Sequence, residues 1–270
     1  MERETALEQK VARLKAKLAD LQERRVVAQF ATPYVDGPRF HLDYDNAEIE
    51  VVAAARQRTA RAQTSEPHTV QWLEESFRDG DVLYDIGANV GSYSLIAAHL
   101  APAARVYAFE PSFASYAVLC SNIALNRLGG RVVPIPLPLG AATAPATLAY
   151  HALGPGAGAH GGTVHVGEDT VFEQGALMFR LDDLVRLFGL SAPALVRLAA
   201  GGREPEILAG AVETFSAPSL RSVIVELGSD DTLLGALAAH GFDQHEVHRR
   251  PGSPIRFATL RRAKTPAASA

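Results

Sequence analysis

The chain has 270 residues, a formal net charge of −4, 47% hydrophobic residues and 21% charged residues. This length and composition are typical of a soluble globular protein with one large domain and an extension, or with two small domains. A mildly acidic chain has no global attraction for nucleic acid or for an anionic membrane, so we expect neither as a partner. The single cysteine, Cys120, excludes an intrachain disulfide and argues against a cysteine-based zinc site. We predict no metal site.

Residues 1–29 are predicted to form a helix, because apolar residues recur at steps of three and four between charged residues. The apolar positions are Leu7, Val11, Leu14, Leu18 and Leu21. Two interpretations stay open for this segment. It either joins two copies of the chain into a homodimer, or is an amphipathic helix that packs on its own domain or is frayed.

A linker follows this helix, as Pro33, Gly37 and Pro38 indicate. We therefore divide the chain into an N-terminal helix and linker (1–45), a main domain (46–264) and a tail (265–270). The charged N-terminus lacks the apolar stretch of a secretory signal, and no run of residues reaches the length of a membrane span. These features predict a cytoplasmic protein.

The main domain is predicted to alternate between helices and strands. Residues 46–78 are expected to be mostly helical, with a break near Pro67, and 140–176 are expected to form a long loop. Strands are expected at 81–86, 105–109, 131–139, 194–198 and 222–227, and helices at 92–100, 112–126, 182–188, 205–215 and 231–240. The runs 244–248 and 255–260 are expected to close the fold as a hairpin.

This alternation predicts an α/β fold: a Rossmann-like, mostly parallel sheet with helices on both faces and a C-terminal antiparallel hairpin. The strand at 131–139 contains three prolines. Because proline cannot donate to the hydrogen-bond ladder, we expect this strand at an edge of the sheet.

A glycine turn follows the first strand of the sheet and reads Gly87-Ala-Asn-Val-Gly91. Glycine allows a tight bend and a close approach of a ligand to the backbone, and the next helix presents its positive end there. In open α/β sheets such a turn lies at the carboxyl edge, where ligands bind.

Two carboxylates next to this turn indicate which ligand binds. Asp85 ends the first strand and Glu110 ends the second, where an acid can accept hydrogen bonds from ribose hydroxyls. An acid in the turn would repel the pyrophosphate of a dinucleotide, whereas S-adenosylmethionine (SAM) has no phosphate and carries an ammonium and a sulfonium. We therefore predict SAM as the cofactor. The predicted cofactor-binding residues are Asp85, Gly87, Ala88, Asn89, Gly91, Glu110 and Pro111.

Several segments resemble the FkbM-type SAM-dependent methyltransferases. These are residues 81–94 and 106–111, the asparagines Asn122 and Asn126, and the later segments 181–184, 206–211 and 223–227. The resemblance runs from about residue 80 to 228 and leaves the N-terminal 45 residues outside. It implies that residues 46–264 form a SAM-dependent methyltransferase domain.

One departure from that family concerns the segment after the fourth strand. The family usually reads Lys-Ile-Asp-x-Glu-Gly-x-Glu, and this chain reads Arg197-Leu-Ala-Ala-Gly-Gly-Arg-Glu204. Ala199 and Gly201 replace two acids that would face the site. A general base for a neutral hydroxyl is therefore missing from its expected place.

Glu226 is our first candidate for a substitute base, because it ends a strand that points at the site. The predicted catalytic residues are Glu226, Glu204 and Arg197. Other candidates lie in the long loop, at His151, His160, His165 and Asp169.

The leading hypothesis is a SAM-dependent methyltransferase that acts on a small-molecule or sugar-like hydroxyl. The alternative is a SAM-binding or scaffold relative that has lost catalysis together with the acids at positions 199 and 201. A nicotinamide oxidoreductase is a third, weaker hypothesis, because it would require a glycine-rich turn that this chain lacks.

Overall fold

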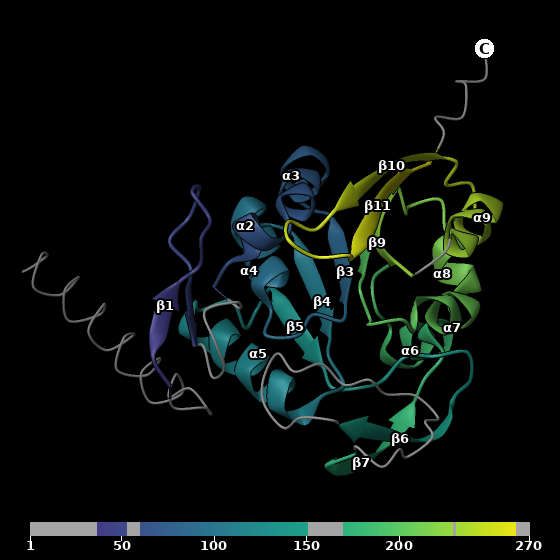
Figure 1. Cartoon of the computed structure of the whole chain (residues 1–270), viewed down its shortest axis with the longest axis horizontal. Coiled ribbons are helices and arrows are strands. Elements are labelled where there is room, and N and C mark those ends of the chain that lie inside the picture. Colours follow the sequence, from purple (N-terminus) through teal and green to yellow (C-terminus); the bar gives the residue numbers. More distant parts are fainter. Residues whose placement is uncertain (1–36, 53–59, 151–169, 229–230, 263–270) are drawn as a thin grey trace, which may run out of the picture.

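A computed structural model of the chain describes residues 37–52, 60–150, 170–228 and 231–262 (Figure 1). The predicted helix at 1–29, and with it the predicted dimer contact, lies outside the described residues. Within the described residues, no helix is long and apolar enough to cross a bilayer.

The domain is built on a seven-stranded sheet with the order β10-β11-β9-β8-β3-β4-β5. Five strands run parallel: β3 (Val82–Ile86), β4 (Arg105–Phe109), β5 (Val132–Ile135), β8 (Leu195–Leu198) and β9 (Ser222–Leu227). The hairpin of β10 (Gln244–Arg249) and β11 (Arg256–Arg261) adds two antiparallel strands beside β9. The predicted Rossmann-like fold, its C-terminal hairpin and the edge position of β5 are confirmed.

Helices cover both faces of the sheet (Figure 1). On one face lie α3 (Pro67–Ser76), α4 (Ser92–Leu100) and α5 (Phe113–Leu125), with the short α2 (Ala62–Ser65) before them. On the other face lie α6 (Leu181–Phe188), α7 (Glu204–Ala209), α8 (Val212–Ser216) and α9 (Thr232–Ala239). Each face of the sheet has its own hydrophobic core. Because successive strand residues point to opposite faces, Leu83 belongs to the core under α3, α4 and α5, and Tyr84 belongs to the core under α6 to α9.

The chain order of the strands reverses between β3 and β8. It runs outward from β3 through β4 to β5, and returns on the other side of β3 through β8 to β9. Open α/β sheets bind their ligands at the carboxyl ends of the strands on either side of such a reversal, which here are β3 and β8.

The segment before α2 differs from the expected helix. Residues Arg39–His41 (β1) and Glu50–Val52 (β2) form an antiparallel pair that spans the predicted boundary at residue 45. Asn122 of α5 and Asn126, the residue directly after α5, hold β2: Val52 N donates to Asn122 Oδ1 at 2.7 Å and Glu50 N to Asn126 Oδ1 at 3.1 Å. The expected helix was wrong here because these distant side chains satisfy the backbone of an extended segment.

The predicted loop at 140–176 was also wrong in part. Residues Ala144–Tyr150 (β6) and Phe172–Met178 (β7) form an antiparallel pair outside the main sheet (Figure 1). The predicted helix at 205–215 is two helices, α7 and α8, with Gly210 between them. A Cβ at Gly210 would lie 2.0 Å from the carbonyl oxygen of Gly140, so the backbone segments touch at this break.

Asp182 joins α6 to α8 through its carboxylate. The side chain is 2% exposed and accepts hydrogen bonds from Glu213 N, Thr214 N and Thr214 Oγ1 at 2.8–3.0 Å. It therefore satisfies the amides at the start of α8, which have no partner within the helix.

We predict that Asp182→Ala lowers the free energy of unfolding by about 2–3 kcal/mol, because it leaves buried donors without an acceptor. Urea unfolding measures this change. The matched control is Asp183→Ala, which removes solvent-accessible contacts with Arg186, Arg180 and Thr143 and should cost clearly less than Asp182→Ala. Equal losses in the two variants would contradict this role for Asp182.

Candidate cofactor and active site

The glycine turn after β3 is shaped by close backbone packing. Gly87 has φ +80°, and a Cβ there would lie 2.0 Å from the carbonyl oxygen of Ala199. Gly91 has φ +91°, and a Cβ there would lie 2.5 Å from Leu119 Cδ1. The positive φ favours glycine at both positions, and at Gly87 the nearby backbone also leaves no space for a side chain. The turn is thereby pressed against the segment that follows β8.

Hydrogen bonds from the end of β4 hold the turn in place. Gly87 N and Ala88 N both donate to the carbonyl oxygen of Phe109 at 3.0 Å. Asn89 N donates to Glu110 Oε2 at 2.8 Å, and Asn122 Nδ2 donates to the carbonyl oxygen of Val90 at 2.9 Å. These four hydrogen bonds tie the turn to the end of β4 and to α5.

Glu110 lies at the end of β4 beside this turn and is 7% exposed. Its Oε1 accepts from Ser112 N at 2.9 Å and its Oε2 from Asn89 N. Burial raises the pKa of the Glu110 carboxyl to about 7, although these two amides favour the charged form and the charge of Asp85 opposes it. A carboxylate has about four acceptor positions, so the two amides leave capacity for a pair of hydroxyls.

Pro111 follows Glu110 and connects it to the β6–β7 pair. Gln174 of β7 donates from Nε2 to the carbonyl oxygen of Pro111 at 3.2 Å, and its Oε1 accepts from Tyr150 Oη at 2.5 Å. The β6–β7 pair is therefore attached next to the acid at the end of β4.

Asp85 does not present its carboxylate to open space. The residue is 0% exposed; Oδ1 accepts from Arg197 Nη1 at 3.1 Å and Oδ2 from Ser94 Oγ at 2.6 Å. The sequence argument placed this acid next to the cationic groups of SAM. The geometry shows a carboxylate that ties β3 to β8 and α4, and it lies near enough to Glu110 to raise that group's pKa.

Arg197 of β8 occupies the centre of a buried ion cluster. Its guanidinium contacts Asp85, Glu66 Oε2 at 3.3 Å and the carbonyl oxygen of Gly87 at 3.4 Å, and it lies over the Tyr93 ring at 4.4 Å. Burial opposes its charge, but the charges of Glu66 and Asp85 outweigh burial and raise the pKa of Arg197. This arrangement suits a residue that positions its neighbours and not one that transfers a proton.

Glu66 is a member of this cluster that sequence reasoning missed. It precedes α3, is 3% exposed and also contacts Arg250 from the turn between β10 and β11. Burial opposes its charge, but Arg197 and Arg250 outweigh burial and lower the pKa of Glu66. The only signal in the sequence was an acid directly before Pro67, which is common at a helix start.

Glu226 and Glu204 lie at the carboxyl edge near the positions where acids were expected. The register pairs Leu198 with Val225, so Ala199 follows beside Glu226. Burial and then the charge of Glu204 raise the pKa of the Glu226 carboxyl, while Arg250 and Arg197 oppose this shift. Glu204 is 2% exposed and Oε1 accepts from Ala200 N at 2.6 Å, so it ties down the loop after β8.

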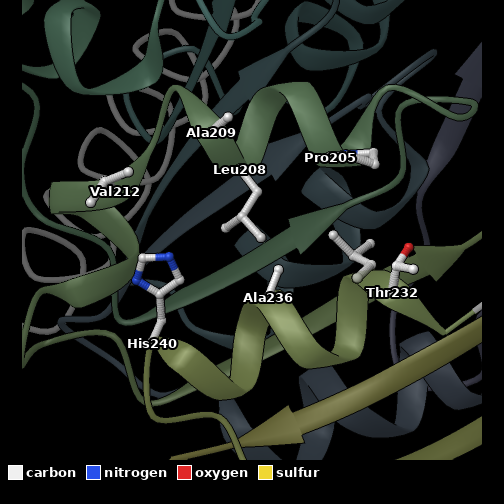
Figure 2. Close-up of a pocket in the computed structure, with 8 residues that line it drawn as sticks. Pro205, Leu208, Ala209, Val212, Thr232, Ala236 and His240 are labelled. Carbon is white, nitrogen blue, oxygen red and sulfur yellow. The ribbon is translucent and has the colours of Figure 1, made fainter.

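The loop candidates His151, His160, His165 and Asp169 lie outside the described residues. Within the described ranges, no group of three or more histidine, cysteine or acidic side chains could hold a metal ion. A separate apolar hollow lies between α7, α8 and α9, with His240 at one end (Figure 2). None of the predicted site residues lines it.

The side-chain oxygen of Asn89 in the turn is a buried acceptor that lacks a donor in the described part of the chain. Asn89 has φ +53°, and its Oδ1 is buried without a hydrogen-bond partner among the described residues. Such an atom is costly unless a donor reaches it. The ammonium of SAM is such a donor, and the free acceptor capacity of Glu110 suits ribose hydroxyls. The residues around the turn therefore fit SAM.

Comparisons with known proteins point the same way. The model of the TRM5/TYW2 methyltransferase domain matches residues 49–139. The chain is 29% identical to the 31-O-demethyl-FK506 methyltransferase FkbM of Streptomyces tacrolimicus, across 61% of this chain and 74% of that protein. It is also 29% identical to the hexuronic acid methyltransferase AglP of Haloferax volcanii, across 60% of this chain and 62% of that protein.

A solved structure supports the fold. The precorrin-6y C5,15-methyltransferase from Geobacter metallireducens GS-15 superposes with a TM-score of 0.51 and 16% identity, and the match covers 84% of this chain and 100% of that one. The chain has the α/β Rossmann-like methyltransferase fold and is a SAM-dependent methyltransferase with SAM as its cofactor.

We predict that SAM binds several-fold more weakly at pH 6 than at pH 8. Because the pKa of Glu110 is about 7, much of this carboxyl is protonated at pH 6, and hydrogen bonds to the ionised form are the stronger ones. Isothermal titration calorimetry measures the Kd at each pH. In Glu110→Gln, binding should be weak and nearly independent of pH. If Glu110→Gln kept the pH dependence of SAM binding seen in the natural protein, the assignment of Glu110 as a SAM ligand would be contradicted.

The Glu110 carboxyl should also affect the stability of the fold, but here the protonated form is the favourable one. Its folded-state pKa is raised, so the stability that it contributes is fully present below its ordinary pKa of 4.5 and is lost as the pH rises through about 7. We predict that the SAM-free Glu110→Gln variant loses less thermal stability between pH 5 and pH 8 than the natural protein. Thermal unfolding monitored by circular dichroism tests this, and parallel declines would refute it.

Proposed function

We propose that this enzyme is an FkbM-type O-methyltransferase that acts on a hydroxyl of a small-molecule or sugar-like acceptor. The name of the first relative supports an oxygen of a small molecule as the acceptor, since it refers to an O-demethylated compound. The name of the second relative supports a sugar-like acceptor, since it refers to a hexuronic acid. The motif segments that resemble the FkbM-type enzymes fall on β3, the glycine turn, β4 and α5.

The cofactor would be held by residues of the turn and by the end of β4. Glu110 would accept hydrogen bonds from the ribose hydroxyls, and Asn89 Oδ1 would accept one from the ammonium. Gly87, Ala88 and Gly91 would shape the backbone beneath the ligand, and Pro111 would border it. Asp85 would act indirectly, by fixing the turn through Arg197 and Ser94.

The position of Glu226 is the observation on which the proposed reaction depends. When bound, SAM supplies a methyl group on a sulfonium, which an acceptor oxygen attacks in line while the sulfur keeps the bonding pair. Glu226 would accept the hydroxyl proton as this bond forms. Its pKa is raised above the ordinary value by burial and by Glu204, and a base with a raised pKa holds a proton more readily at neutral pH.

The other two predicted catalytic residues are assigned supporting roles. Arg197 is engaged by Asp85 and Glu66, and Glu204 is bound to the amide of Ala200. Neither has a free proton-accepting position comparable with Glu226, which is only partly buried. In this proposal Glu226 takes over the role of the two acids that FkbM-type enzymes carry at the positions of Ala199 and Gly201.

The proposal is tested by incubating the purified enzyme with SAM and a panel of hydroxyl-bearing acceptors that includes macrolides, hexuronic acids and neutral sugars. Formation of S-adenosylhomocysteine and mass spectrometry of the products are the readouts. We expect a methyl ether on at least one acceptor class. A methyl ester on the hexuronic acid carboxylate alone, methylation only at nitrogen or carbon, or methylation of added RNA in place of these acceptors would contradict the proposal.

We predict that Glu226→Gln lowers kcat by about 10²–10⁴-fold, the usual contribution of a positioned base, and leaves the Kd for SAM within about twofold. The rise of kcat with pH through the titration of Glu226 should also disappear. Glu206→Gln is the matched control, because Glu206 lies exposed on α7, and its kcat should stay near that of the natural enzyme. A Glu226→Gln enzyme with full kcat would remove Glu226 from the mechanism.

A further inference from the structure

We propose that Arg250 and Glu66, which lie outside the segments that resemble the FkbM-type enzymes, are positioning residues for the cofactor turn. Arg250 belongs to the turn between β10 and β11, and Glu66 precedes α3. Together with Arg197 and Asp85 they form a continuous chain of charges from the C-terminal hairpin to the end of β3. We call these four residues the ion chain.

The first step in the ion chain joins the hairpin to α3. The guanidinium of Arg250 contacts Glu66 Oε1 and lies over the Phe257 ring at 5.3 Å. The turn itself is closed by Arg250 N, which donates to the carbonyl oxygen of Ile255 at 2.9 Å. Both the backbone and the side chain of Arg250 are therefore held in one orientation.

The second step passes through Glu66 to Arg197. Glu66 Oε2 accepts from Arg197 Nη2 at 3.3 Å and from Thr69 Oγ1 at 3.0 Å. With Arg250 on Oε1, both oxygens of this buried carboxylate have cationic partners. Such a carboxylate is stable only while those partners stay in place.

The third step reaches the cofactor turn. Arg197 Nη1 contacts Asp85 Oδ1 at 3.1 Å and the carbonyl oxygen of Gly87 at 3.4 Å. Gly87 is the residue whose missing Cβ lets the turn approach Ala199. The orientation of one guanidinium therefore affects the backbone at the first residue of the turn.

The balance of charges explains how a distant residue influences this turn. The ion chain contains two carboxylates and two guanidinium groups, so the charges of its four members cancel, and Glu226 lies beside them within reach of Arg250 and Arg197. Without Arg250, Glu66 would have Arg197 as its one remaining cationic partner in the chain and would compete with Asp85 for it. Arg197 would shift toward Glu66 and loosen its contacts with Asp85 and Gly87.

This charge argument predicts a specific pattern of SAM affinities. Arg250→Met should raise the Kd for SAM by about five- to twentyfold, a usual range for coupling between separate sites. Arg250→Lys, which keeps the charge but not the fork of donors, should raise it less. The double variant Glu66→Gln with Arg250→Met should return to within about threefold of the natural Kd, because removing the unpaired carboxylate restores neutrality.

Calorimetric titration of the full-length proteins with SAM alone measures these values. Arg249→Met is the matched control, since Arg249 is the exposed neighbour of Arg250, and its Kd should not change. Thermal unfolding without SAM is measured in parallel. A merely structural role would lower the unfolding temperature of Arg250→Met without recovery of SAM affinity in the double variant.

The inference rests on the assignment of the glycine turn to SAM, and the outcomes separate the two. If the natural protein does not bind SAM, both the cofactor assignment and this inference fail. If the natural protein binds SAM and Arg250→Met binds it equally well, only the role of Arg250 and Glu66 is overturned. A double variant that binds more weakly than Arg250→Met would also overturn it.

Discussion

The buried contact between Arg197 and Asp85 is the interaction on which the candidate site depends. It joins β8 to β3 at the point where the strand order reverses, and Arg197 also contacts the carbonyl oxygen of Gly87 at the start of the turn. A buried ion pair of this kind costs desolvation and is weak evidence for stability. Its value here is geometric, because it ties β8 to β3 directly beneath the glycine turn that we propose as the SAM site.

The parts of the fold that the sequence predicted are those set by local patterns. Apolar runs such as 82–86 and 222–227 are strands because both faces of a parallel strand are buried. Gly87 and Glu110 could be placed at one edge of the sheet, because the carboxyl ends of parallel strands meet there. Prolines near 134 put β5 at the sheet edge because they cannot donate to a neighbour.

The parts of the fold and of the site that the sequence did not predict depend on contacts between residues far apart in the chain. The β1–β2 pair is extended because Asn122 binds the backbone of Val52 across 70 positions. Glu66 meets Arg250 across 184 positions and Arg197 across 131. No local spacing reveals such partners. The burial of Asp85 was missed for the same reason: its partner Arg197 is 112 positions away, and the sequence argument treated the acid as a free ligand for SAM.

Ala199 and Gly201 stand after β8 where the FkbM-type enzymes carry acids, and Glu226 lies on the neighbouring strand β9. Our proposal therefore assigns the reactive carboxylate to β9. The assignment of the glycine turn and Glu110 to SAM is tested most directly by a crystal structure of the protein with S-adenosylhomocysteine. Our account predicts that Glu110 accepts both ribose hydroxyls while Asp85 stays bound to Arg197 beneath the turn. A ligand bound away from Glu110, or an Asp85 that leaves Arg197 to contact the ligand, would contradict it.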